Sequence, residues 1–163
     1  MGSRKPGSMT DRDFGDARAW AFPGFLQKIT TITSAQLLAL NATAQTLVPA
    51  PGSGLTALLD EIKMVYSGGT AYAGIAAGED MQARYTSAAG AVASEIQEVT
   101  GWLDQTTGST KWIRRLGCVA GTLNVYSENA LLCMHMLTGE ITTGTGTIKC
   151  ETRYRIEPTT IRD

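Results

Sequence analysis

Alternation of apolar and polar residues is clearest over residues 147–156. One side of this segment carries Ile148, Cys150, Thr152, Tyr154 and Ile156, and the other carries Lys149, Glu151, Arg153 and Arg155. Successive side chains of a strand point to opposite faces, so the pattern predicts a strand with one buried face and one solvated face. The preceding segment, Ala130–Leu137, is apolar on both faces. We therefore expect a strand there that a second sheet or another subunit covers on both sides.

The connection between these two segments, Thr138–Gly146, holds three glycines and four threonines. Glycine adopts the positive φ values that tight turns require, and threonine suits re-entry into a strand. The pattern thus predicts a β-hairpin over residues 128–156. Two of the three cysteines, Cys133 and Cys150, lie on its two arms, which would place them near each other.

Further short strands are predicted upstream, each bounded by turn residues. They are Ala44–Pro49, Leu58–Tyr66, Glu79–Tyr85, Lys111–Leu116 and Leu123–Tyr126, and β-branched residues also mark Lys28–Ile32. Prolines and glycines predict a turn at Pro49–Gly54, and glycines predict another at Ser67–Ala73. Strands at this spacing, separated by turns, are typical of an all-β domain.

Two segments favour helix. Thr33 or Ser34 is a good N-cap for a short helix over the sequence AQLLALNA, although the same segment could lead into a strand. Residues Ala91–Val99 are helical by propensity. We therefore expect an antiparallel β-sandwich or jelly roll of about eight strands, with one or two short helices.

The chain has 163 residues, which indicates one domain with a sizeable core. We expect an extended N-terminal arm over residues 1–27 and the sandwich over residues 28–163. Only 18% of residues are charged and the net charge is −1, so nucleic acid binding has no electrostatic support. No apolar run reaches membrane-spanning length and no signal peptide is visible, so we expect synthesis in a cytoplasm. The three cysteines have no CxxC spacing and are expected to be reduced.

Candidate chemistry is sparse. The single histidine, His135, lies in an apolar segment without the neighbours that zinc requires, which favours a packed or interface residue. The adjacent acids Asp60–Glu61 and Glu79–Asp80 are expected to point to opposite faces of their strands. No nucleophile, phosphate-binding or dinucleotide motif is present. We therefore predict no catalytic residue, no metal and no cofactor.

Aromatic residues mark two candidate contact regions. Trp20, Phe22 and Phe25 form a cluster at the end of the arm, which would anchor it on this domain or on a neighbour. Trp102 and Trp112 flank the loop Asp104–Thr110 and could stack on a sugar. A carbohydrate-binding module is therefore an alternative function. The competing interpretation is that these tryptophans are buried in the core or at a subunit contact.

Three strings resemble small virion proteins of tailed bacteriophages: SAQLLALNATAQTLVPAPGSG, YSGGTAYA and NALLCMHMLTGEITTGTGTIKCETRYRI. The similarity spans residues 34–156 and consists of strands and turns. It implies a non-enzymatic β-sandwich of the particle, either a head-decoration (cement) protein or a tail, baseplate or head-fibre module.

The resemblance also implies partners. They would be further copies of the chain, as a homotrimer, and the major capsid protein or another virion protein, with no membrane. Ala130–Leu137 would then lie at a subunit interface, and the arm would reach a neighbouring protein. The candidate interface residues are Trp20, Phe22, Phe25, Leu131, Cys133, His135 and Leu137.

Overall fold

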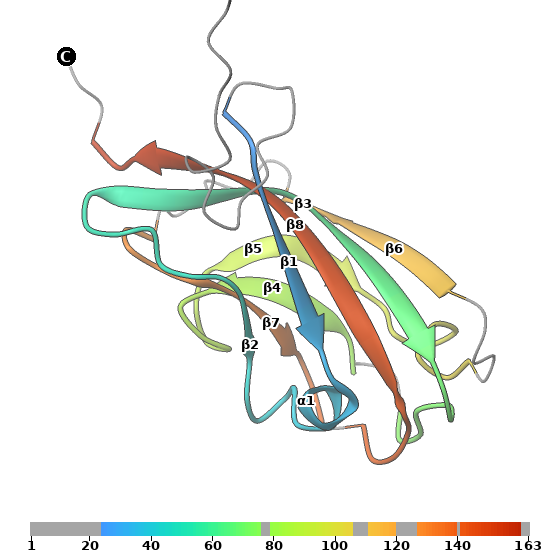
Figure 1. Ribbon diagram of the computed structural model, residues 1–163. Helices are drawn as coiled ribbons and strands as arrows, with labels where there is room; N and C mark the ends of the chain where they lie inside the picture. Colours follow the sequence, from blue (N-terminus) through green and yellow to red (C-terminus); the bar gives the residue numbers. More distant parts are fainter. Residues whose placement is uncertain (1–23, 76–78, 106–110, 120–126, 140, 161–163) are drawn as a thin grey trace, which may run out of the picture.

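The computed structural model describes residues 24–75, 79–105, 111–119, 127–139 and 141–160 (Figure 1). These residues form eight strands and one short helix, α1 (Ser34–Leu38). The strands are β1 (Leu26–Ile32), β2 (Gln45–Val48), β3 (Leu55–Gly68), β4 (Met81–Tyr85), β5 (Val92–Gln97), β6 (Lys111–Gly117), β7 (Leu132–Met136) and β8 (Gly146–Pro158). Strand β1 begins two residues inside the segment that we predicted to be the arm.

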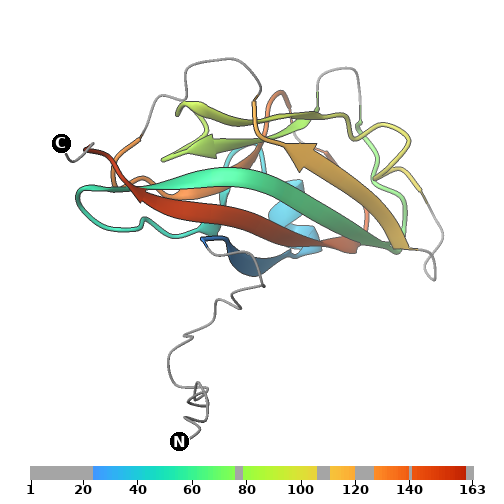
Figure 2. The same cartoon turned by 90° about the horizontal axis from the view of Figure 1, so that it is seen from above.

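The strands form two antiparallel sheets of four strands each. Sheet A has the order β1-β8-β3-β6, and sheet B has the order β2-β7-β4-β5. Seen from above, the sheets lie as two layers facing each other (Figure 2). The predicted all-β antiparallel sandwich is therefore confirmed.

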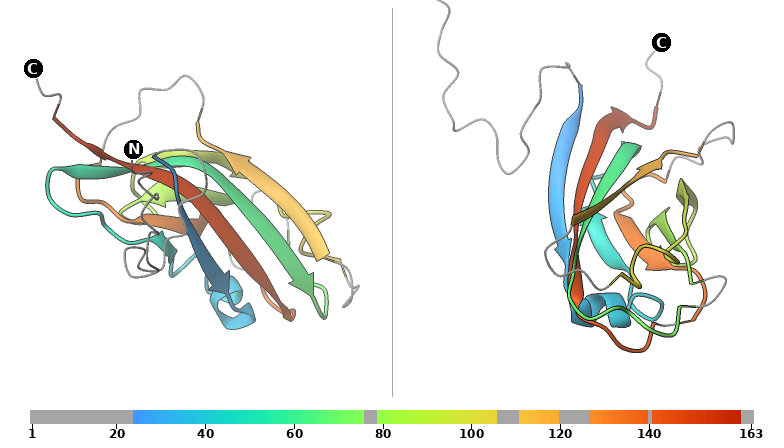
Figure 3. Two further views of the ribbon diagram at one scale, coloured as in Figure 1. Left: turned by 45° about the horizontal axis from the view of Figure 1, so that its top comes forward. Right: turned by 90° about the vertical axis from the view of Figure 1, so that its right-hand side faces the viewer.

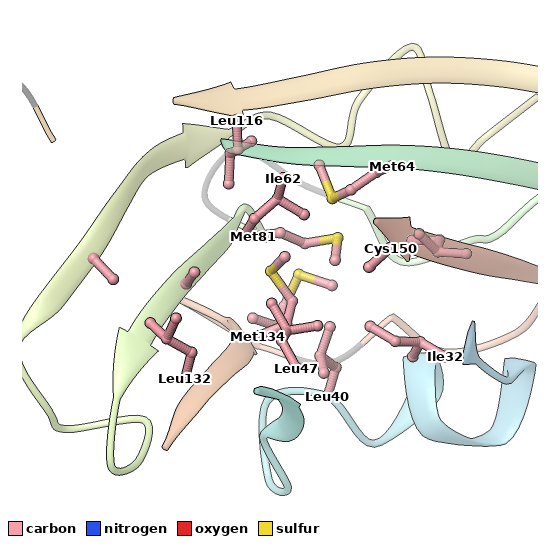
Figure 4. Close-up of a cluster of buried hydrophobic side chains, with 14 of the residues drawn as sticks. Ile32, Leu40, Leu47, Ile62, Met64, Met81, Leu116, Leu132, Met134 and Cys150 are labelled. Carbon is pink, nitrogen blue, oxygen red and sulfur yellow. The ribbon is translucent and has the colours of Figure 1, made fainter. Parts of the chain in front are cut away.

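The core lies between the two sheets and is aliphatic and rich in sulfur (Figure 4). Sheet A contributes Met64 and Cys150, and sheet B contributes Met81 and Met134, all of which are completely buried. Methionine is flexible and polarizable, so it fills the irregular space between two twisted sheets. Leu37 of α1 is also buried, so the helix covers one end of this core.

The predicted hairpin over residues 128–156 is wrong, although both of its strands exist. Strand β7 pairs with β2 and β4 in sheet B, whereas β8 pairs with β1 and β3 in sheet A. The chain therefore leaves sheet B after Met136 and enters sheet A at Gly146. Hairpin connections usually have two to five residues, and the length of this one is the signal against direct pairing. As a result Cys133 and Cys150 lie in opposite sheets.

The helix expected at Thr33 or Ser34 is confirmed, and Thr33 is its N-cap. The Thr33 hydroxyl accepts a hydrogen bond from Gln36 N, and Gln36 Oε1 accepts one from Thr33 N. This reciprocal arrangement is a capping box, which stabilises a five-residue helix that would otherwise be marginal. The helix predicted over Ala91–Val99 is wrong, because this segment forms the edge strand β5. Pairing with β4 outweighs its local helical propensity.

The strands predicted at 44–49, 58–66, 79–85 and 111–116 are confirmed as β2, β3, β4 and β6. The strand predicted at Leu123–Tyr126 lies outside the described residues. The turn at Pro49–Gly54 is confirmed, and residues beyond β6 hold it in place. Gly52 N donates to Asn129 Oδ1 (2.9 Å), and Gly54 N donates to Glu128 Oε1 (2.6 Å). These bonds fix the connection between β2 and the long strand β3.

The two glycine-rich segments of the sequence pack against each other at one end of the sandwich. Thr70 N donates to Thr145 Oγ1 (2.8 Å), and Tyr72 Oη donates to Gly146 O (2.9 Å). A β-carbon on Gly144 would lie 2.5 Å from the Tyr72 ring, so glycine is required there. At this end of the sandwich the backbone therefore packs closely over the buried rings of Tyr66 and Trp102.

Contacts between the sheets bridge both lateral edges of the sandwich. Figure 3 shows the edge strands of the two sheets from two further sides. At one edge Thr30 Oγ1 of β1 donates to Leu47 O of β2 (3.2 Å). At the other edge Ser94 and Cys118 form an isolated antiparallel bridge. These contacts restrict access to the core from the edges and leave the outer faces of the two sheets as the main surfaces for partners.

Candidate docking surface

The outer face of sheet A is a regular surface built from four paired strands. Strand alternation directs the side chains opposite the core outward, and the pairing register aligns them in rows across the four strands. We call this surface the A face. It comprises Ile29, Thr31, Glu61, Lys63, Val65, Ile113, Arg115, Lys149, Glu151 and Arg153.

Most charges on the A face are paired with a charge on a neighbouring strand. Lys63 Nζ lies 3.9 Å from a carboxylate oxygen of Glu151, and Arg115 Nη1 lies 3.5 Å from Glu61 Oε2. Arg153 lies within 4.0 Å of Glu61 on its other side. These side chains are 32–67% exposed, so each pair adds little to stability. The A face contains four basic and two acidic side chains, and no ion pair of the described residues involves Lys149, so this polar surface keeps a small net positive charge.

A β-bulge at Asp60 corrects one expectation about the paired acids. Leu59 lies opposite Tyr154 and Glu61 lies opposite Arg153, so Asp60 is an extra residue in β3. We predicted that Asp60 and Glu61 would point to opposite faces. The bulge instead brings both carboxylates to the Arg153 guanidinium, at 2.6 Å from Asp60 and 4.0 Å from Glu61.

Phe25 lies against the same arginine cluster at the start of the described chain. Its ring centroid is 4.6 Å from Cζ of Arg153 and 5.3 Å from Cζ of Arg155. Cations over an aromatic face are attracted by the ring quadrupole. Phe25 therefore anchors the chain on this domain, on the outer side of sheet A. Trp20 and Phe22, the other members of the predicted anchor, lie outside the described residues.

Two isoleucines are exposed on the A face, one on each edge strand. Ile29 of β1 is 59% exposed and Ile113 of β6 is 52% exposed. Single exposed aliphatic residues are common on protein surfaces. Here they flank a polar surface on which most charges are paired, which gives the face an apolar contact at both margins.

The candidate interface residues of β7 and its ends are largely covered by their own chain. Cys133 is 2% exposed and His135 is 7% exposed, whereas Leu131 and Leu137 are half-buried. His135 Nδ1 lies 3.3 Å from Leu40 O, and Cys133 Sγ lies 3.4 Å from Arg84 O. Strand β7 is thus buried on both faces, as predicted, but by sheet A and by loops of the same chain. Only Leu131 and Leu137 keep surface for a neighbouring subunit.

A shallow cavity of about 340 Å³ lies beside β7 on the outer side of sheet B. Small and hydroxylated side chains line it, with the Cys133 thiol and Leu131 at one side. Burial raises the pKa of Cys133, although its backbone hydrogen bond and the charge of Arg84 lower it in part. The thiol is therefore protonated at neutral pH and is a weak nucleophile.

The pKa values of two further buried groups, His135 and Cys150, are also shifted in the directions that keep these groups neutral near pH 7. Burial lowers the pKa of His135, the charge of Arg84 lowers it further, and the Leu40 carbonyl opposes both effects. Burial raises the pKa of Cys150 to about 12. Within the described residues no three His, Cys, Asp or Glu side chains form a group that could hold a metal ion.

One of the two tryptophans of the predicted sugar-binding site is buried in the core. Trp102 is completely buried and lies edge-on to Tyr66, with ring centroids 6.1 Å apart. A buried ring cannot stack on a saccharide, so Trp102 is a core residue. The loop it flanks is described only at Asp104 and Gln105.

Comparison with known proteins gave no match: no family model, curated protein or solved structure matches the chain. Among the described residues, no helix is long and apolar enough to cross a membrane.

Proposed function

We propose that the protein is a non-enzymatic structural component of a tailed-bacteriophage particle, a head-decoration (cement) protein that oligomerises and stabilises the shell. The observation that carries this proposal is the A face. A four-stranded sheet face on which most charges are paired can lie against another protein surface and bury few uncompensated charges there.

The apolar margins of the A face supply a driving force for that contact. Complete burial of an isoleucine side chain contributes roughly 1.5–3 kcal/mol, and Ile29 and Ile113 are about half exposed. Repetition of the contact in an oligomer would multiply this modest gain, since linked contacts bind more tightly than single ones. The partners proposed are two further copies of the chain and the major capsid protein.

The non-enzymatic part of the proposal is supported by the chemistry of the described side chains. The adjacent carboxylates of Asp60 and Glu61 both lie beside Arg153, and burial shifts the pKa values of Cys133, Cys150 and His135 toward the neutral forms. General acid–base and nucleophilic catalysis need groups that exchange a proton near neutral pH.

Mass in solution tests the self-association. The full chain and the variants Ile29→Asp and Ile113→Asp would be compared by light scattering after size exclusion. We expect a trimer for the full chain and a smaller species for each variant. Ile156→Asp is the control, because Ile156 is 40% exposed but lies outside the A face. A monomeric full chain, or equal effects of all three variants, would contradict a role of the A face in assembly.

Quantitative mass spectrometry of purified particles tests the virion assignment. Phage particles from the source that carries the coding sequence would be banded by density, and their proteins quantified. A decoration protein should be present in amounts comparable to the major shell protein. A far smaller amount would indicate a tail or baseplate position, and absence from the particles would contradict the assignment.

A further inference from the structure

Strand β5 presents an exposed surface at the edge of sheet B. Val92 is 41% exposed, Ile96 is 56% exposed, and Glu95 and Glu98 are also exposed. We call these four residues the acidic patch. It offers a partner both apolar area and negative charge, the two components that contact surfaces between proteins combine.

The acidic patch faces away from the core and reaches the lateral edge of the sandwich. In the pairing register Ile96 lies opposite Gln82, which alternates with the core residues of β4. The Glu95 carboxylate lies close to the neighbouring strand β6, because a β-carbon on Gly117 would lie 3.5 Å from Glu95 Oε2. The patch therefore ends where β5 and β6 adjoin.

Both acids of the patch lack a cationic partner among the described residues. None of the ion pairs in this part of the chain involves Glu95 or Glu98. Arg84 lies on the same outer side of sheet B, but its guanidinium donates to Gln82 Oε1 (3.1 Å) and to Gly90 O (3.5 Å). The negative charge of the patch is therefore available to a partner.

The A face carries the opposite charge, beginning at the same lateral edge. Val65 of β3 lies between Ile113 of β6 and Lys149 of β8 in the pairing register, and Arg115 follows Ile113 on the same side of β6. We call these four residues the basic patch. The Arg115 side chain is 67% exposed, and Lys149 is exposed. The A face stays positive even when Asp60 is counted with it, because it then holds four cations and three acids.

The two patches match each other in composition and in spacing. Each has two aliphatic side chains and two charges of one sign. Ile96 precedes Glu98, the residue directly after β5, by two positions, and Ile113 precedes Arg115 by two positions. In extended backbone such residues point to the same side, about 6.8 Å apart. Isoleucine can therefore meet isoleucine while a carboxylate accepts hydrogen bonds from a guanidinium.

We propose that the acidic patch of one copy binds the basic patch of the next copy, so that the chain assembles head to tail. This inference rests on the proposed self-association through the A face and names the surface that the A face contacts. A contact between two like patches would bring like charges together, which is unfavourable in an interface. The two patches lie on opposite outer faces, so each copy keeps one patch for a further neighbour. Such contacts close into a ring, here of three copies, or continue as an open chain.

Charge reversal in the full chain tests this contact. One variant carries Glu95→Lys and Glu98→Lys, a second carries Arg115→Glu and Lys149→Glu, and a third, the full exchange, carries all four substitutions. Each of the first two should self-associate at least about tenfold more weakly than the unmodified chain, as measured by light scattering and sedimentation. The full exchange should recover association, because its two patches again have opposite charges.

Arg155→Glu combined with Glu157→Arg is the matched control. Like the full exchange it swaps exposed charges without changing the net charge, but this ion pair near the end of β8 lies outside both patches. The control should leave self-association unchanged. Thermal melting checks that each variant is folded. Glu61 keeps a contact with Arg153 (4.0 Å) when Arg115 is reversed, so the second variant leaves that acid with a cation.

The outcomes separate failure of this inference from failure of the proposed assembly. If Glu95→Lys with Glu98→Lys left association unchanged while Ile113→Asp weakened it, the A face would contact another surface, and only the inference would be overturned. A folded full exchange that associates as weakly as the partial reversals would overturn it as well. A monomeric unmodified chain would overturn both the inference and assembly through the A face.

Discussion

The Nε atom of Arg153 lies 2.6 Å from a carboxylate oxygen of Asp60, the residue at which β3 and β8 change register. The bulge places a second acid beside an arginine that already faces Glu61 and Phe25. Arg153 is therefore held from three sides, which reduces the entropy that a surface ion pair usually loses on formation.

Asp60→Ala should lower the free energy of unfolding by about 0.5–1 kcal/mol. The expected loss is small because the side chains of Asp60 and Arg153 are each more than one third exposed to solvent. Glu157→Ala is the comparison, since Glu157 pairs with Arg155 at 3.3 Å near the end of β8 and should matter less. Urea denaturation at low and high salt measures both. The effect of Asp60→Ala should shrink with salt, and an effect that is independent of salt would argue against an ion pair.

Gly144→Ala should destabilise the protein strongly, by roughly 3–5 kcal/mol. Gly144 has a φ of +136°, and an added β-carbon would lie 2.5 Å from Tyr72 Cδ1. The substitution therefore combines backbone strain with a clash against a buried ring. Denaturation and near-ultraviolet circular dichroism would measure the loss of stability and of tyrosine packing.

Gly52→Ala separates these two causes. Gly52 also has a positive φ, +112°, but an added β-carbon would meet no atom within 4 Å. Its cost should be only the backbone strain, about 1–2 kcal/mol. Equal losses for both substitutions would show that the contact with Tyr72 is unimportant.

Period-two patterns were sufficient to predict most of the strands, because burial of one face dictates alternation within a strand. They could not assign strands to sheets. Residues 130–137 and 147–156 were both recognised, yet their partners are β4, β2, β3 and β1, which are distant in the sequence. Propensity also misassigned residues 91–99, where edge pairing decides the structure.

The candidate surfaces were only partly predictable. Alternation placed Lys149, Glu151 and Arg153 on a solvated face, and the structure confirms it. The bulge that recruits Asp60 has no local signal, because it depends on the register with β8.

Thr152→Val should raise the free energy of unfolding by about 1 kcal/mol. The Thr152 hydroxyl is completely buried in β8, and no described group pairs with it. A buried hydroxyl without a partner loses its hydration without compensation, so its removal is favourable. Thr56→Val is the control, because the equally buried Thr56 hydroxyl donates a hydrogen bond to Ser127 O (3.3 Å). Its removal should lower the free energy of unfolding by about 1 kcal/mol. A loss at both positions would indicate that Thr152 has a partner in solution.

Stability should fall as the pH decreases below about 6.5, the ordinary pKa of histidine. Burial lowers the pKa of His135 in the folded state, so the unfolded chain binds the proton first. The loss begins near the unfolded pKa and levels off below the folded pKa, with a slope of at most about 1.4 kcal/mol per pH unit. Denaturation at pH 7.5 and 5.5 measures it, and His135→Gln should remove most of the difference. The same pH dependence in the variant would assign it to other groups.

One cysteine should react quickly with a thiol reagent in the folded protein, and all three should react after unfolding. Cys118 is exposed, whereas Cys133 and Cys150 are buried in opposite sheets and are not joined by a disulfide. Burial raises the pKa of both buried thiols, to about 12 for Cys150, so little thiolate is present at pH 8. Cys118→Ser should abolish the fast phase and leave the slow reaction unchanged. If two thiols per chain reacted quickly, the segments that cover Cys133 would have to open readily. The outer side of sheet B would then be less well ordered than its hydrogen bonds indicate.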